Sequence, residues 1–206
     1  MNIKSKKDKK SRLLEIASAQ GGYFTAKQAV KAGYSYRLHH YHKSKRDWLE
    51  IERGVFRLAN YPNTQFEDLI HWSLWSRNRK DIPQAVFSHE TALTVHELGD
   101  VMPSKLHFIV PKKFRKQTQK GCVPHKEILL PKEIEQREGF SVTTPLRTIQ
   151  DMAESPLSLD YLEKIIRDAI RRGQANRQNI QALRFSKKAR EKMRLIIEDI
   201  KKHPEL

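Results

Sequence analysis

The stretch of sequence that decides the fold is GGYFTAKQAVKAGYSYRLHHYHKSKRDWLEIERGVFRLAN, residues 21–60. A Thr-x-x-Gln capping box over Thr25–Gln28 predicts the start of a helix that ends near Ala32. Gly33 then interrupts the helical pattern, and a second helix is predicted over residues 35–44 because a serine stands where its cap would be. Two helices joined by a short turn that contains glycine are typical of a helix-turn-helix.

After residue 44 the apolar residues alternate with polar ones, which is the period of a β-strand. Leu49 and Ile51 alternate in one predicted strand, and Phe56 and Leu58 alternate in the next. Arg53-Gly54 between them predicts a tight turn, so the two strands are expected to form a small hairpin. A hairpin directly after the last helix of a helix-turn-helix is the wing of a winged helix.

A further helix is predicted before this stretch, over residues 5–20, and Gly21-Gly22 ends it. The segment Tyr61-Pro62-Asn63-Thr64 has the composition of a linker. The sequence therefore predicts a winged helix-turn-helix domain over residues 1–61.

Residues 64–206 are expected to form a second domain of mixed helices and strands. The predicted helices span residues 66–77, 88–98, 144–153, 158–172, 176–183 and 187–202, and the predicted strands span residues 105–111, 123–130 and 140–143. The expected fold class is α+β, with the winged helix-turn-helix followed by a mixed α+β domain that ends in helices.

The charge of the chain favours a polyanionic partner. Lys and Arg number 40 against 24 Asp and Glu, which gives a net charge of +16 at pH 7. Residues 1–60 carry 14 Lys and Arg against 5 Asp and Glu, whereas the remaining residues carry 26 against 19. Because the excess per residue is largest at the N-terminal end, we expect duplex DNA to bind there.

The predicted helix over residues 35–44 is the candidate recognition helix. At about 100° per residue, Leu38 and Tyr41 fall on one side, which we expect to face the core. The residues on or beside the opposite, outward side are Tyr36, His39, His40 and Lys43, with Arg37 between the two sides. A recognition helix presents such a face to the major groove.

Roles follow from these positions. Tyr36, His39 and His40 are expected to contact base edges, while positively charged side chains position phosphates. The candidate DNA-binding residues are Tyr36, Arg37, His39, His40, Lys43, Lys45, Arg46, Arg53, Arg57, Lys6 and Arg12. Arg53 and Arg57 would act from the wing, on the DNA backbone or in the minor groove.

Several blocks of the chain resemble AbiEi-type antitoxins, the transcriptional regulators of type IV toxin–antitoxin systems that are linked to abortive phage infection. Residues 22–29, 32–35 and 53–58 resemble their winged-helix domain, and residues 87–93, 106–111 and 142–151 resemble their second domain. The resemblance implies a protein that binds repeats in its own promoter and represses its operon. It also implies a second domain that counteracts a nucleotidyltransferase-like toxin. Family members often carry arginine where this chain has His39 and His40, so the operator is expected to differ.

No metal or cofactor is expected, and the protein is expected to be cytoplasmic. The single cysteine, Cys122, excludes an internal disulfide framework and a cysteine-rich zinc site. His39, His40 and His42 have no second cluster near them in the sequence. No signal peptide is expected, and no run of 18 apolar residues predicts a membrane span.

Catalysis is not expected, and a DNA-processing nuclease is the alternative. A magnesium-dependent nuclease of this kind would carry the tripeptide Glu/Asp-x-Lys on a strand. Asp199-Ile200-Lys201 and Asp8-Lys9-Lys10 match that tripeptide, but both lie in predicted helices. His89-Glu90 and His96-Glu97 lack a nucleophile and the spacing of a zinc protease. A module that binds RNA or only proteins is a further alternative. The basic stretches 112–120 and 187–194 could extend a DNA surface or bind the nucleic-acid substrate of the toxin.

Overall fold

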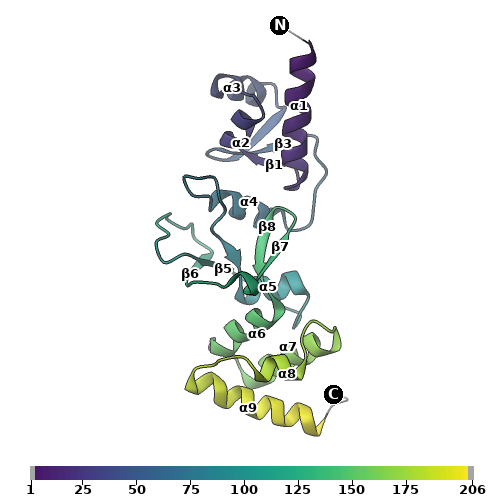
Figure 1. Cartoon of the computed structure of the whole chain (residues 1–206), viewed down its shortest axis with the longest axis vertical. Helices are drawn as coiled ribbons and strands as arrows, with labels where there is room; N and C mark the ends of the chain where they lie inside the picture. The colour runs from purple at the N-terminus through teal and green to yellow at the C-terminus, as the bar shows by residue number, and fades with distance from the viewer. Residues whose placement is uncertain (1–2, 204–206) are drawn as a thin grey trace. The chain divides into compact units, whose positions relative to one another are not determined.

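The computed structural model describes residues 3–203, with side chains from Asp8 onward, and its fold is α+β. The chain divides into two compact units (Figure 1). The first unit runs to Ala85 and includes Gln136–Phe140, and the second contains Val86–Glu135 and the residues from Ser141 onward.

The first unit combines four helices with a three-stranded sheet. Its elements are α1 (Ile3–Ser18), β1 (Tyr23–Thr25), α2 (Ala26–Lys31), α3 (Tyr36–Ser44), β2 (Trp48–Glu52), β3 (Val55–Leu58) and α4 (Glu67–Trp75). The strands are antiparallel in the order β1-β3-β2. The predicted helices and the hairpin with its turn at Arg53-Gly54 are confirmed. Strand β1 was not expected, because three residues are too few to show an alternating pattern.

The predicted capping box forms at the start of α2. Thr25 Oγ1 accepts a hydrogen bond from Gln28 N at 3.2 Å, and Gln28 Oε1 accepts one from Thr25 N at 2.8 Å. The Gln28 amide also exchanges hydrogen bonds of 3.0 and 3.2 Å with the buried Gln20 amide, which lies just after α1. The start of α2 is therefore tied to the end of α1 through side chains that satisfy one another.

Glycine is required at the turn between α1 and β1. Gly22 has φ +86°, and a Cβ there would lie 2.4 Å from the Tyr61 ring. The Gly22 N–H bonds the Ala17 carbonyl at 2.8 Å, which ends α1 and turns the chain into β1.

Helices α1 to α3 pack around the aromatic face of the sheet. The buried residues of this core are Leu13, Ala17, Phe24, Ala29, Ala32, Trp48 and Phe56. The rings of Phe24 and Trp48 meet edge to face, 4.9 Å apart.

Helix α4 belongs to the first unit, although the sequence placed the domain boundary between residues 61 and 64. Glu67 of α4 bonds Arg57 at 3.1 Å and accepts a hydrogen bond from the Tyr23 hydroxyl at 3.3 Å. His71 of α4 also lies 3.0 Å from a Glu52 carboxylate oxygen. These contacts to the sheet explain why the compact unit continues past the Pro62 linker to Ala85.

The second unit contains most of a mixed five-stranded sheet and the helices that follow it, whereas the segment Gln136–Phe140 of that sheet groups with the first unit. The elements from Val86 onward are β4 (Val86–Phe87), α5 (His89–His96), β5 (Leu106–Val110), β6 (Cys122–Lys126), a 3-10 helix (Pro131–Glu133), β7 (Ile134–Arg137), β8 (Phe140–Thr143), α6 (Pro145–Glu154), α7 (Leu159–Arg171), α8 (Arg177–Gln181) and α9 (Lys187–Lys202). The strand order is β6-β5-β4-β8-β7, with β4 antiparallel to β5 and parallel to β8, and β5 parallel to β6. The predicted strand over 123–130 is shorter than expected, and the short strands β4 and β7 were not predicted.

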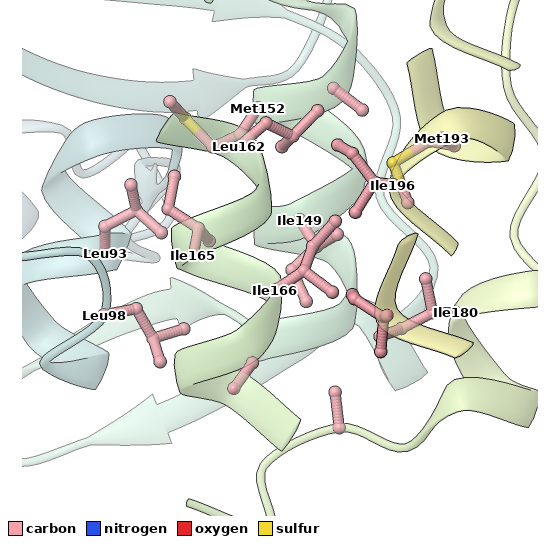
Figure 2. Packing of buried hydrophobic residues seen from close by; sticks show 14 of the residues in the cluster. Leu93, Leu98, Ile149, Met152, Leu162, Ile165, Ile166, Ile180, Met193 and Ile196 are labelled. Carbon is pink, nitrogen blue, oxygen red and sulfur yellow. The ribbon is translucent and has the colours of Figure 1, made fainter. Parts of the chain in front are cut away.

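One apolar cluster of the second unit lies among its helices (Figure 2), and Phe87, Phe108 and Val142 of its sheet are also buried. The buried face of α7 repeats at helical spacing, with Leu162, Ile165, Ile166 and Ala169 all buried. Figure 2 shows Leu162, Ile165 and Ile166 with Leu93 of α5 and Leu98 just beyond it on one side, and the α9 residues Met193 and Ile196 on the other.

Candidate nucleic-acid interface

Helix α3 is held against the sheet by its imidazole and aromatic side chains. His42 stacks on Trp48 with ring centroids 4.7 Å apart, and its Nδ1 lies 2.9 Å from an Asp47 carboxylate oxygen. The turn before α3 is closed by a 2.9 Å hydrogen bond from Tyr34 N to Ala29 O. Ser35 stands at the N-cap as expected, but its side chain makes no capping hydrogen bond.

His39 lies in the core, so its expected contact with base edges is wrong. His39 is only 6% exposed, and its ring centroid lies 5.3 Å from that of Trp48 and 5.8 Å from that of Phe56. Nε2 lies 3.3 Å from the Tyr34 carbonyl oxygen, and burial lowers the pKa of the imidazole. The imidazole packs here as a flat aromatic ring against the core.

The outward face of α3 is rotated from the one that the sequence indicated. Tyr41, expected in the core, is 53% exposed, and Tyr36 is 63% exposed. The exposed residues on this helix are Tyr36, Arg37, His40, Tyr41 and Ser44, and Lys45 and Arg46 follow them, also exposed. At about 100° per residue these five helix positions form one continuous arc opposite His39 and His42. We call these seven exposed residues the α3 surface: Tyr36, Arg37, His40, Tyr41, Ser44, Lys45 and Arg46.

Three other expected contacts lie on the surface of the first unit. Lys43 is half-buried and bonds Glu50 of β2 at 2.7 Å, so its charge is partly neutralised. Arg53 is exposed at the tip of the hairpin. Arg12 is exposed on α1 and pairs with Asp8 at 2.6 Å. Lys6 lies in α1, but its side chain is outside the described residues.

Arg57 is a structural residue, which contradicts its expected role on the wing. It is 8% exposed, and Nη2 donates to Asn63 Oδ1 at 2.8 Å and to Glu67 Oε1 at 3.1 Å. The hydrogen bond from Thr64 N, followed by the charge of Arg57, lowers the pKa of Glu67 despite its partial burial. Burial and then Glu67 raise the pKa of the neighbouring Tyr23 hydroxyl to about 12. The arginine joins β3 to α4 and is not available to a phosphate.

The remaining sequence candidates do not assemble into one site. Asp199-Ile200-Lys201 lies on α9, where Asp199 pairs with Arg167 at 2.7 Å, and Asp8-Lys9-Lys10 lies on α1. The stretch 112–120 lies between β5 and β6 and is mostly exposed, and 187–194 is the first half of α9. His96 is buried, with Nε2 2.7 Å from the Thr143 carbonyl oxygen.

The second unit brings three histidines together that the sequence did not connect. The rings of His89 and His125 stack with centroids 3.9 Å apart, and His107 Nδ1 lies 3.1 Å from His125 Nε2. Burial lowers the pKa of all three, that of His89 to about 3. We call His89, His107 and His125 the histidine cluster. Pairing of β5 with β6 creates it, and no local pattern in the sequence predicts that pairing.

A charged network surrounds Arg147 in the same unit. Its Nε bonds Asp151 Oδ1 at 2.7 Å, one turn along α6, and its guanidinium also pairs with Glu127 and Glu133. Burial raises the pKa of Asp151 to about 7, against the opposing effect of Arg147. The i, i+4 spacing of Arg147 and Asp151 was a visible signal for this pair.

No protein-family model matches the chain, and no curated protein is significantly similar to it. Within residues 3–203, no helix combines the length and the apolar character needed to cross a lipid bilayer.

Proposed function

We propose that the first unit is a winged-helix DNA-binding domain and that the protein is a DNA-binding transcriptional regulator. The observation that carries the proposal is the α3 surface, which combines aromatic, imidazole and basic side chains over residues 36–46 without one acidic residue. The order of three helices followed by a hairpin supports the same conclusion, because a winged helix has that order.

The roles in DNA binding that we propose for these residues differ from those expected from the sequence. Tyr36, Arg37 and His40 lie in the N-terminal half of α3 and are exposed, so they are the side chains available to base edges in a major groove. Lys45 and Arg46 at the end of the helix, and Arg53 at the tip of the hairpin, are placed to contact phosphates on either side. His39 and Arg57 support the domain from within.

The resemblance to AbiEi-type antitoxins extends the proposal beyond DNA binding. On that basis the protein represses its own operon and counteracts a nucleotidyltransferase-like toxin in the cytoplasm. This part rests on the blocks of sequence that resemble the family, and the α3 surface does not bear on it.

The test is selection of duplexes from a randomised DNA library with the full chain, followed by fluorescence anisotropy on the selected sequence in dilute salt. Arg37→Ala is expected to weaken binding about tenfold or more, since one good base contact contributes about 1–3 kcal/mol. His40→Ala is expected to change the selected sequence as well as the affinity.

Lys80→Ala is the matched control, because Lys80 is an exposed cation of the same unit that lies outside α3 and the hairpin. It is expected to bind like the wild type. Wild-type protein that selects no sequence, or an Arg37→Ala variant with unchanged affinity and preference, would overturn the proposal.

A further inference from the structure

The three members of the histidine cluster are fixed by different elements of the second unit. His89 is the first residue of α5, His107 lies on β5, and His125 lies on β6. In the parallel pairing of β5 and β6, His107 is opposite Val123, so His125 lies two residues further along and on the same face. The backbone of His107 is held from both sides, because its N–H bonds Thr91 Oγ1 at 2.8 Å and its carbonyl accepts from Ser88 N at 3.0 Å.

The nitrogen atoms of the cluster lie at distances suited to one metal ion. One nitrogen from each of the three rings lies within 4.8 Å of the other two. Zinc held tetrahedrally at about 2.0–2.1 Å from each imidazole places its ligand nitrogens about 3.4 Å apart. His107 Nδ1 and His125 Nε2 are 3.1 Å apart and already meet this spacing. His89 lies within 4.8 Å of both, but its ring stacks on that of His125 at an interplanar angle of 12°, so the His89 side chain must rotate out of the stack to direct its lone pair at the same ion.

The surroundings of His89 favour coordination through one defined nitrogen. Its Nδ1 lies 2.9 Å from Ser88 Oγ, which leaves Nε2 as the nitrogen free to bind a metal ion. A hydrogen bond to the second ring nitrogen is the usual way in which a protein orients a histidine ligand.

The chemistry of the donors indicates the class of metal. Neutral imidazole binds Zn²⁺, Cu²⁺, Ni²⁺ and Fe²⁺, whereas Mg²⁺ and Ca²⁺ require oxygen ligands. Imidazole binds a metal ion in its neutral form. Among the described residues this is the one group of three or more histidine, cysteine or acidic side chains with such spacing.

We propose that His89, His107 and His125 bind one divalent transition-metal ion of the zinc class, with a fourth coordination position open to water or to another ligand. Three protein ligands and an open position are the arrangement of exchangeable rather than purely structural zinc sites. The proposal is independent of DNA binding by the first unit.

The experiment uses the full chain, freed of metal with a chelator and then titrated with ZnCl₂, CoCl₂ or MgCl₂ by calorimetry. We expect one zinc or cobalt ion per chain and no binding of magnesium. The cobalt-loaded protein is expected to show the strong visible absorption of tetrahedral Co²⁺, which reports the coordination directly in the wild-type protein.

Two variants locate the site. His107→Gln and His125→Gln are each expected to weaken zinc binding by on the order of a hundredfold, because ligands matter at least as much as the partners that orient them. His203→Gln is the matched control, since His203 is an exposed histidine outside the cluster, and Cys122→Ser tests the nearby thiol. Both controls are expected to bind zinc as the wild type does.

Absence of stoichiometric zinc and cobalt binding to the wild type would overturn the proposal. So would a weak, octahedral-type cobalt spectrum, or unchanged affinity in a double His107→Gln, His125→Gln variant. The wild-type spectrum keeps the test valid even if circular dichroism shows that a variant is not folded.

Discussion

Two arginines on the same hairpin have opposite surroundings and should respond differently to removal. Arg57 is buried and bonded to Glu67, whereas Arg53 is exposed at the turn. Arg57→Ala leaves Glu67 without its cation, so we expect the free energy of unfolding to fall by about 3 kcal/mol. Arg53→Ala should change it by no more than about 0.5 kcal/mol.

Urea denaturation followed by tryptophan fluorescence measures this difference in the right part of the chain. All three tryptophans, Trp48, Trp72 and Trp75, belong to the first unit. For DNA binding we expect the opposite order. Arg53→Ala should bind DNA more weakly than the wild type does, while its free energy of unfolding stays unchanged. Equal stability of the two variants would contradict the structural role of Arg57.

Asp151 should make the stability of the second unit fall as the pH rises. Burial raises its pKa from 3.8 to about 7 in the folded protein, so the folded state holds a proton that the unfolded state has released. The unfolded state therefore binds fewer protons between these values, and the free energy of unfolding decreases with pH across that window. The decrease between pH 5 and pH 8 should be about 2–3 kcal/mol, and it should end above the folded pKa.

The side chain of the Asp151→Asn variant cannot ionise, so the variant should lose the contribution of Asp151 to the pH dependence of the free energy of unfolding. Urea denaturation followed by far-ultraviolet circular dichroism at pH 5 and pH 8 compares the variant with wild type. Asp160→Asn, which removes an exposed carboxyl of α7, should keep the wild-type pH dependence. A parallel pH dependence for wild type and Asp151→Asn would show that Asp151 is ionised throughout.

At the scale of elements, local patterns predicted what local interactions hold together. The capping box at Thr25 and Gln28 forms α2, and the turn at Gly54 forms the hairpin, because each depends on residues a few positions apart. The buried face of α7 follows from its spacing in the same way. These elements could be predicted from the sequence alone.

The orientation of α3 could not be predicted in this way, because polarity was used to assign its faces. His39 was counted as polar and Tyr41 as apolar, yet the ring of His39 is enclosed by Trp48 and Phe56 while Tyr41 is exposed. Histidine and tyrosine each combine an apolar ring with a polar group, so a helix rich in both has no clear apolar side.

Contacts between distant segments were the second feature that the sequence did not predict. The histidine cluster depends on the pairing of β5 with β6, and β4 has only two residues, too few for any periodicity. The partners of such strands lie far away in the sequence, and the period of a strand does not identify its neighbour.

At the scale of the whole molecule, the net charge of +16 overstates the charge available to DNA. Arg57, Arg77, Arg147 and Arg167 are all engaged by carboxylates within the fold. The cations of the proposed interface that have exposed side chains are fewer, namely Arg37, Lys45, Arg46 and Arg53. Affinity for DNA should therefore scale with this small group and not with the total.

The affinity of the full chain for DNA should depend on salt concentration through the exposed cations that contact phosphates. Each phosphate neutralised contributes about 0.9 to the slope of log K against log salt concentration, so phosphate contacts by Lys45, Arg46 and Arg53 give a slope of roughly −2.7. Affinity should then fall about 40-fold between 50 and 200 mM salt. Lys45→Ala should reduce the slope by about 0.9, because it removes one exposed cation at the end of α3. Lys164→Ala, which removes an exposed cation of the second unit paired with Asp100, should leave the slope unchanged. A slope near −10 would mean that many cations outside the proposed interface also lie on the DNA, and a slope near zero would mean that the α3 surface binds something other than a polyanion.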